Sequence, residues 1–159
     1  MTSTQQSRPF LFTLLLQAQH QMVQELVRRL AAAGFSDIRP AHSRVFENLD
    51  VRHGTRLIDL AERAQMTHQS MSELVASLQE RGYVERRPDP ADRRAKIVCF
   101  TPKGRQMMRV AVPQIAAIEE EWLRRLDGGC DGDLRTALQE AVRATEGYPD
   151  DAPKVEAER

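Results

Sequence analysis

The sequence lacks long apolar runs, which limits where the protein can act. No stretch approaches the roughly 20 consecutive apolar residues that a membrane-spanning helix needs. Residues 1–9 also lack the basic and then apolar order that marks a secretory signal peptide. We therefore expect a cytoplasmic protein without a membrane partner.

Cysteine and aromatic residues are scarce. The two cysteines, Cys99 and Cys130, lie far apart and show no disulfide or zinc-site spacing. No metal-ligand spacing joins the four histidines either: His20, His42, His53 and His68. Aromatic residues make up 5% of the chain, which suits an aliphatic, helical core. We predict no metal and no cofactor.

Sequence signatures of catalysis are missing as well. We find no glycine-rich phosphate loop, no nucleophile motif and no pair of carboxylates placed for acid–base work. The length of 159 residues and the hydrophobic fraction of 41% are ordinary for one globular domain. We expect a binding protein and not an enzyme.

Charge is balanced overall but separated along the chain. The net charge of zero argues at first against a nucleic-acid partner. Residues 81–109, however, hold nine basic and three acidic side chains, whereas residues 127–159 hold nine acidic and four basic ones. Local charge is what meets phosphate. The sequence therefore predicts a basic working surface and an acidic end.

Two helices separated by a short turn are predicted within residues 57–82. Apolar residues at one-and-four spacing from Leu57 indicate a short helix, and Gln65 and Met66 form the turn. Thr67 can cap a second helix, which Gly82 ends. The N-terminal part of that helix carries polar side chains that we predict to read bases: Thr67, His68, Gln69, Ser70, Ser72 and Glu73.

A β-hairpin is predicted next, from strands at 83–87 and 96–100 around a loop rich in proline and aspartate. Helix, turn, helix and hairpin in this order favour a winged helix-turn-helix on double-stranded DNA. Arg93 and Arg94 at the loop tip suit a minor groove. Further basic side chains suit phosphate contacts: Arg86, Arg87, Lys96 and Lys103. The alternatives are a merely solvated helix face and simple solubility charges.

The run from Asp89 to Lys96, followed by Val98, Thr101 and Gly104, resembles the wing signature of the MarR (multiple antibiotic resistance regulator) family. Residues 57–86 resemble that family's helix-turn-helix. The resemblance implies a homodimer at palindromic DNA, released by a small phenolic or aromatic-acid effector. It also implies that Asp92 braces the wing and that Arg94 enters the minor groove.

An effector cavity at the junction of the dimer helices and the DNA-binding lobe is a further implication of the resemblance. We select three residues as candidate walls of this cavity: His42, Phe46 and Met108. A histidine that is simply solvated or part of the core is the alternative for His42.

The expected architecture is mainly α with a small β-wing. Residues 1–8 form a disordered N-terminus, residues 9–50 and 101–147 a helical dimerisation region, residues 51–100 the winged helix-turn-helix, and residues 148–159 a disordered acidic tail. Within these regions we expect a helix from Pro9 to Ala33, one from Pro40 to Leu49, a third wing strand at Thr55–Arg56, and a bend before Pro113.

Our functional hypothesis is a homodimeric DNA-binding regulator, a repressor of a pseudo-palindromic operator that a small molecule releases. Two alternatives stay open. One is a redox-responsive regulator acting through Cys99 or Cys130. The other is a winged-helix module whose basic wing meets an acidic protein partner.

Overall fold

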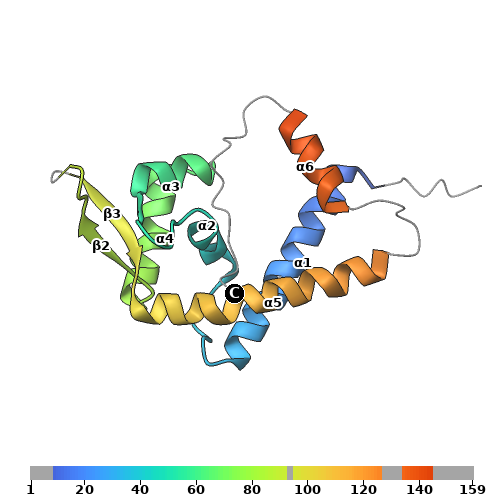
Figure 1. The fold of residues 1–159 in the computed structure, drawn as a ribbon, viewed down its shortest axis with the longest axis horizontal. Helices are drawn as coiled ribbons and strands as arrows, with labels where there is room; N and C mark the ends of the chain where they lie inside the picture. The colour runs from blue at the N-terminus through green and yellow to red at the C-terminus, as the bar shows by residue number, and fades with distance from the viewer. Residues whose placement is uncertain (1–8, 93–94, 127–133, 145–159) are drawn as a thin grey trace, which may run out of the picture.

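The computed structural model describes residues 9–92, 95–126 and 134–144. In chain order it contains α1 (Leu11–Ala32), η1 (Pro40–His42), α2 (Ser43–Phe46), β1 (Thr55–Arg56), α3 (Leu57–Arg63), α4 (His68–Glu80), β2 (Val84–Pro88), β3 (Lys96–Phe100), α5 (Pro102–Leu126) and α6 (Leu134–Ala144). The small sheet lies at one end of the molecule, beside α3, α4 and the start of α5 (Figure 1). The predicted fold class, mainly α with a β-wing, is confirmed. None of the helices described here is long and apolar enough to cross a membrane.

The helix-turn-helix forms where the sequence predicts it. After α3, Gln65 takes a left-handed φ of 51°, which reverses the chain between the two helices. The Thr67 hydroxyl then accepts a hydrogen bond from the Ser70 amide at 3.1 Å and caps α4. Gly82, with φ of 74°, follows α4 and turns the chain toward the wing.

The wing is a three-stranded antiparallel sheet in the order β1-β3-β2. Thr55 lies opposite Val98, so the third strand expected from the sequence is confirmed. Strand β2 begins at Val84, one residue later than predicted. The backbone of Tyr83 is engaged elsewhere, because its amide donates to Leu78 and its carbonyl accepts from Thr101.

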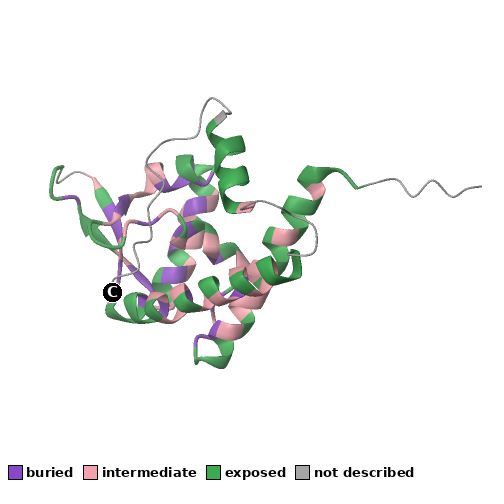
Figure 2. Cartoon of the chain, turned by 45° about the vertical axis from the view of Figure 1, so that its right-hand side comes forward, coloured by how far each residue is buried: buried purple, intermediate pink, exposed green. Residues whose placement is uncertain are grey.

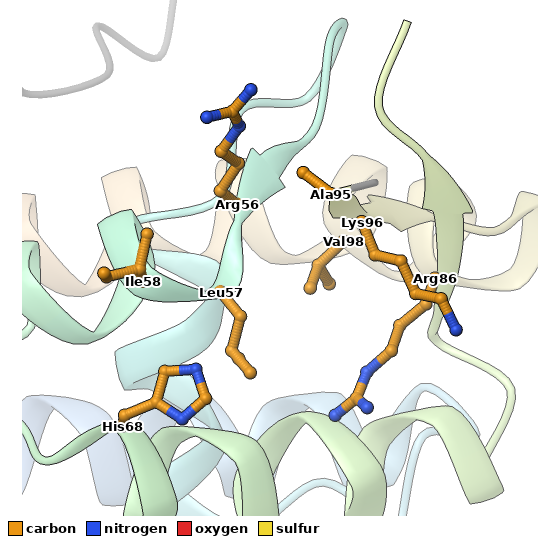
Figure 3. Close-up of a pocket in the computed structure, with 8 residues that line it drawn as sticks. All are labelled: Arg56, Leu57, Ile58, His68, Arg86, Ala95, Lys96 and Val98. Atoms are coloured by element: carbon orange, nitrogen blue, oxygen red, sulfur yellow. The ribbon is translucent and has the colours of Figure 1, made fainter. Parts of the chain in front are cut away.

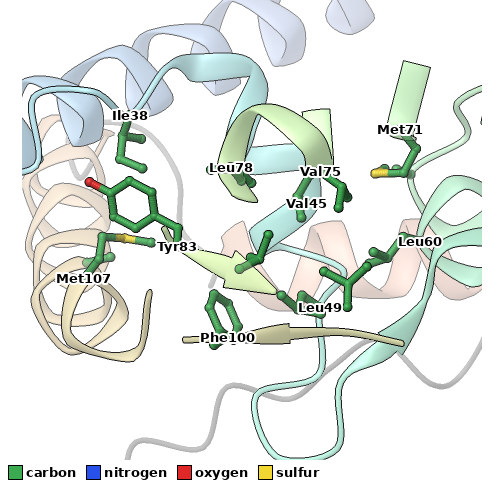
Figure 4. Packing of buried hydrophobic residues seen from close by; sticks show 14 of the residues in the cluster. Ile38, Val45, Leu49, Leu60, Met71, Val75, Leu78, Tyr83, Phe100 and Met107 are labelled. Atoms are coloured by element: carbon green, nitrogen blue, oxygen red, sulfur yellow. The ribbon is translucent and has the colours of Figure 1, made fainter. Parts of the chain in front are cut away.

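The buried core joins the winged helix-turn-helix to the C-terminal end of α1 and the first half of α5 (Figure 4). Met71, Val75 and Leu78 point from α4 into this core and are fully buried. Tyr83 and Phe100 close it from the start of β2 and the end of β3. Because α4 buries one face here, its opposite face is left for solvent or a ligand.

Helix α5 extends from the wing to α1, against which it packs (Figure 1). At the crossing, the Arg29 guanidinium donates to both carboxylate oxygens of Glu121 at 2.9 and 2.8 Å. It also donates to Glu25 at 2.7 Å. This paired arginine fixes the position of α1 against the helix that carries the wing. Helix α5 continues through Pro113, and the bend expected there remains a prediction.

The second helix is shorter than expected. The sequence predicted one helix from Pro40 to Leu49, whereas the structure has a 3-10 turn at Pro40–His42 and an α-helix that ends at Phe46. The Asn48 side chain donates to the Arg44 carbonyl at 2.9 Å and takes the place of the next backbone donor. Asparagine often ends helices by competing with the backbone in this way.

Candidate nucleic-acid interface

The outward face of α4 carries the polar residues that the sequence selected for base reading. Thr67, His68, Gln69 and Glu73 are exposed, and Ser70 and Ser72 are half-buried at the edges of the same face. The Thr67 hydroxyl donates to the Ser70 hydroxyl at 2.9 Å and accepts from the Ser70 amide. The cap therefore engages Thr67 and Ser70, and leaves the Thr67 methyl group available for contact.

Two stripes of side chains follow from the helical repeat of α4. His68 and Ser72, four residues apart, share the side that faces the wing, where the Arg86 guanidinium donates to the Ser72 hydroxyl at 3.3 Å. Gln69 and Glu73 share the next stripe, and the Gln69 amide donates to the Glu73 carboxylate at 3.3 Å. This contact orients the Gln69 carboxamide while leaving its oxygen and second N–H free.

A partly buried ion pair at the start of the wing loop involves Asp89. The Arg56 guanidinium donates to Asp89 at 2.6 Å, and the other oxygen of Asp89 accepts from the Ala91 amide at 2.8 Å. The Ala91 amide, and then Arg56, hold the pKa of the Asp89 carboxyl below its usual value. The backbone amide of Asp89 also donates to the Ala95 carbonyl at 3.0 Å, which joins the two ends of the wing loop.

The bracing contact found here is therefore at Asp89, which is 7% exposed, whereas the sequence pointed to Asp92. Asp92 is exposed, and its carbonyl accepts from the Ala95 amide at 2.9 Å. Bracing by the Asp92 carboxylate remains a prediction. The partner of Asp89 comes from β1, 33 residues earlier in the chain, so no local sequence pattern predicts this pair.

Asp89→Asn is expected to lower affinity for a specific DNA duplex more than Asp92→Asn does. The substitution removes the charge that holds Arg56 and loosens the loop that carries the wing arginines. Electrophoretic or fluorescence titration of both variants at one salt concentration measures the difference. A larger loss in Asp92→Asn would show that Asp92 is the main brace.

The candidate phosphate-binding residues differ in how far they are engaged within the protein. Arg86 and Lys96 are exposed beside α4, and Arg87 donates to Glu85 at 3.0 Å. Lys103 donates to the Arg81 carbonyl at 2.7 Å and lies 4.1 Å above the Tyr83 ring. Lys103 thus stabilises the junction of α4 and α5, and a phosphate would have to displace these contacts. Arg93 and Arg94 lie outside the described residues.

The three candidate walls of an effector cavity lie within or against the core. His42 is buried, and its Nδ1 accepts from the Arg39 amide at 3.1 Å while Nε2 lies 3.2 Å from the Ser77 hydroxyl. Phe46 stacks on Phe100, and Met108 packs against the core. With both ring nitrogens occupied, His42 behaves as the core histidine that the sequence held as an alternative. The effector cavity stays a prediction.

The stability of the protein should depend on the protonation of His42. Burial, and then the nearby Arg81 and Arg39, lower the pKa of its imidazole below the ordinary 6.5. The unfolded chain therefore binds this proton more readily, so the stabilisation is present above about pH 6.5 and is lost as pH falls below it. We expect wild type to lose more stability than His42→Gln between about pH 7.5 and about pH 5.5 in denaturant titrations. Equal losses would exclude His42 as the titrating group.

The described cysteine is poorly suited to redox sensing. Cys99 is half-buried in the centre of β3, and burial raises the pKa of its thiol. A thiol that resists ionisation reacts slowly with peroxide, because the thiolate is the nucleophile. Cys130 lies outside the described residues. In the part of the chain that is described, no three His, Cys, Asp or Glu side chains gather as a metal site would require.

Comparison with known proteins agrees with this geometry. Residues 36–95 match the sequence model of the MarR family. The transcriptional regulator HosA of Escherichia coli O111:H- is 36% identical over 75 residues, which are 47% of this chain and 56% of HosA. The chain thus spans just over half the length of this curated relative.

Solved structures extend the likeness beyond the winged helix-turn-helix. The transcriptional regulator PA4135 superposes with a TM-score of 0.67 and 25% identity over 87% of this chain and 99% of its own. The transcriptional repressor CouR, bound to a 23-mer DNA duplex, superposes with a TM-score of 0.63 and 25% identity over 85% of this chain and 91% of its own. Residues 36–95 thus match the MarR family, and the chain shares its fold with solved transcriptional regulators over most of its length.

Proposed function

We propose that this protein is a homodimeric transcriptional regulator, a repressor that binds a pseudo-palindromic DNA site and that a small effector releases. The observation that carries the proposal is the pairing of an outward polar face on α4 with a wing that exposes Arg86, Arg87 and Lys96. An α-helix fits the major groove, and arginines beside it suit phosphates and the minor groove. CouR, a relative in fold, is bound to a DNA duplex in its solved structure.

Exposed apolar surface supports the homodimer. Phe10 and Leu11 at the start of α1 are 73% and 71% exposed, and further large apolar side chains are exposed on α1, α5 and α6: Phe12, Leu14, Leu15, Leu16, Ile115, Leu123, Leu126, Leu138 and Val142. Figure 2 shows that the first half of α1 stands away from the buried core. Large apolar areas on a monomer mark an interface. A two-fold axis through these helices would place two α4 helices about one turn of DNA apart, ~34 Å.

A small aromatic acid is the effector class that we propose, because the MarR resemblance points to it. The effector would bind one arrangement of the two reading heads more tightly than the other. Release of DNA then follows from a change in the spacing or the angle of the heads. A panel of aromatic acids added to a preformed protein–DNA complex tests this part separately from DNA binding.

Selection from a random duplex library tests the function without knowledge of the target genes. We expect wild type to enrich an inverted repeat with half-sites about one helical turn apart. Enrichment of no sequence, with only salt-sensitive general binding, would contradict a sequence-specific regulator. Capture of acidic protein segments with no DNA preference would favour the protein-contact module.

Gln69→Ala should change sequence preference at one position of each half-site. Oriented by Glu73, the Gln69 carboxamide can accept from N6 and donate to N7 of adenine. Its loss should remove about 1–3 kcal/mol of discrimination at that position. Competition titrations with single-base variants of the selected duplex measure this, and Gln79→Ala, an exposed change at the other end of α4, is the control. A uniform loss on all duplexes would mean that Gln69 does not read a base.

The redox alternative has a separate test. Burial of Cys99 disfavours it, and Cys130 remains its other candidate. Thiol titration and DNA binding before and after peroxide treatment distinguish a redox switch from an effector switch. Loss of binding on oxidation, prevented by Cys130→Ser, would favour the redox switch.

A further inference from the structure

A hollow of about 370 Å³ lies between the recognition helix α4 and the wing (Figure 3). Side chains from four elements line it: Arg56 from β1, Leu57 and Ile58 from α3, His68 from α4, Arg86 from β2, and Ala95, Lys96 and Val98 from the wing loop and β3. We infer that this hollow seats one backbone phosphate of the bound DNA, together with its deoxyribose. The inference rests on the proposed DNA binding and specifies where helix and wing hold the same strand.

The charge of the lining suits a phosphate. Arg86, Lys96 and His68 line the hollow from three elements, with the Arg86 guanidinium turned toward α4, and the lining contains no carboxylate (Figure 3). Arg56 is directed to the upper rim, where Asp89 pairs with it at 2.6 Å. The positive charges of Arg86 and Lys96 therefore remain for an incoming anion. Charge-assisted hydrogen bonds to phosphate are among the stronger polar contacts that a protein makes.

The apolar part of the lining suits a sugar. Leu57, Ala95 and Val98 form the inner wall, and Ile58, 54% exposed, stands at the edge. Small-molecule sites usually measure roughly 300–1,000 Å³, so the hollow can admit a sugar-phosphate unit and little more. A flat charged surface would bind phosphates at many positions along its length. The lined hollow instead fixes the position of one sugar-phosphate unit.

The hydrogen bond from Arg86 to Ser72 connects the two sides of the hollow. The wing contributes Arg86, and α4 contributes Ser72 and its stripe neighbour His68. A phosphate bound between Arg86 and His68 would therefore fix the wing relative to the recognition helix. The role of His68 changes accordingly, from the base reading that the sequence suggested to phosphate binding.

Duplexes with a single neutral methylphosphonate linkage test the seat, with the sequence taken from the library selection. Replacing the seated phosphate of each half-site with a neutral linkage should weaken wild-type binding about tenfold. The same replacement should weaken binding of Arg86→Ala or His68→Ala little further, because these variants already lack the contact with that phosphate. Each should also reduce the salt slope of log affinity by up to about one per half-site.

Arg87→Ala is the matched control, since Arg87 lies next to Arg86 on β2 but does not line the hollow. The loss of affinity caused by Arg87→Ala should add to the loss caused by the neutral linkage at the hollow. Additive effects of Arg86→Ala and His68→Ala at every linkage, with specific binding intact, would overturn the seat and leave the proposed function standing. Absence of any specific DNA binding by wild type would overturn both. Melting temperatures of the variants exclude misfolding as the cause.

Discussion

Replacing Arg94 with alanine is expected to weaken binding to the specific duplex at least roughly thirtyfold near physiological salt, or about 2 kcal/mol. Arg94 falls in the sequence between β2 and β3, outside the described residues. A guanidinium placed there meets the negative potential of a minor groove, which attracts arginine strongly. In the proposed homodimer each protomer would contribute one such side chain, so one substitution would remove both contacts.

Arg124→Ala is the control for this prediction, because it removes an equal charge from the far end of α5. Arg124 is exposed, and its guanidinium pairs with Glu120 at 3.3 Å. Affinity of the control should change by less than about threefold, since exposed ion pairs contribute little. Fluorescence anisotropy with labelled duplex measures both variants. Equal affinities of wild type and Arg94→Ala would show that the wing does not bind DNA in the proposed way.

Gly104→Ala is expected to cause the largest loss of stability from the addition of one methyl group. A Cβ atom at this buried position would lie 2.1 Å from the Tyr83 carbonyl oxygen and 2.9 Å from the Phe100 ring. The Tyr83 carbonyl already accepts from the Thr101 amide at 3.1 Å, so moving it away breaks a contact that starts α5. Overpacking of this kind costs about 1–3 kcal/mol or more.

The higher helix propensity of alanine offsets only part of the cost of this clash. Alanine favours a helix over glycine by about 1 kcal/mol, which opposes the clash but does not offset contact with a backbone atom. We expect a net loss of about 2 kcal/mol and a melting temperature lower by about 4–8 °C at equal protein concentration. Gln106→Ala, an exposed change two residues later, should have almost no effect. Calorimetry that finds Gly104→Ala as stable as wild type would show that helix α5 does not approach Tyr83 so closely.

Features set by neighbouring residues in the chain could be predicted from the sequence. Thr67 caps α4 and Gly82 follows it, because each depends on backbone preferences within a few residues. The outward polar face of α4 follows from the same logic, since burial of Met71 and Val75 decides which side chains point outward. The third strand at Thr55–Arg56 pairs with the distant β3, and its prediction drew on the family resemblance.

Features that depend on distant partners could not be predicted in this way. Asp89 and Asp92 look alike in sequence, and the hydrogen bond to Asp89 depends on Arg56 of the distant β1. His42 is enclosed because Ser77 of α4 lies against it, although its local sequence resembles an exposed helix start. The hollow beside His68 likewise exists only once the wing folds over α4. All three features arise from the packing of strands and helices that are distant in sequence, and not from the spacing of residues along the chain.

The most direct test of the central claim is a titration of the purified protein with the DNA that flanks its own gene, against a random duplex, at several salt concentrations. We expect a complex of two protomers per site, a clear preference for the flanking or selected sequence, and a steep fall of affinity with salt as phosphate contacts are lost. Equal, weak binding to both duplexes with a shallow salt slope, repeated with the sequence obtained by library selection, would contradict this claim.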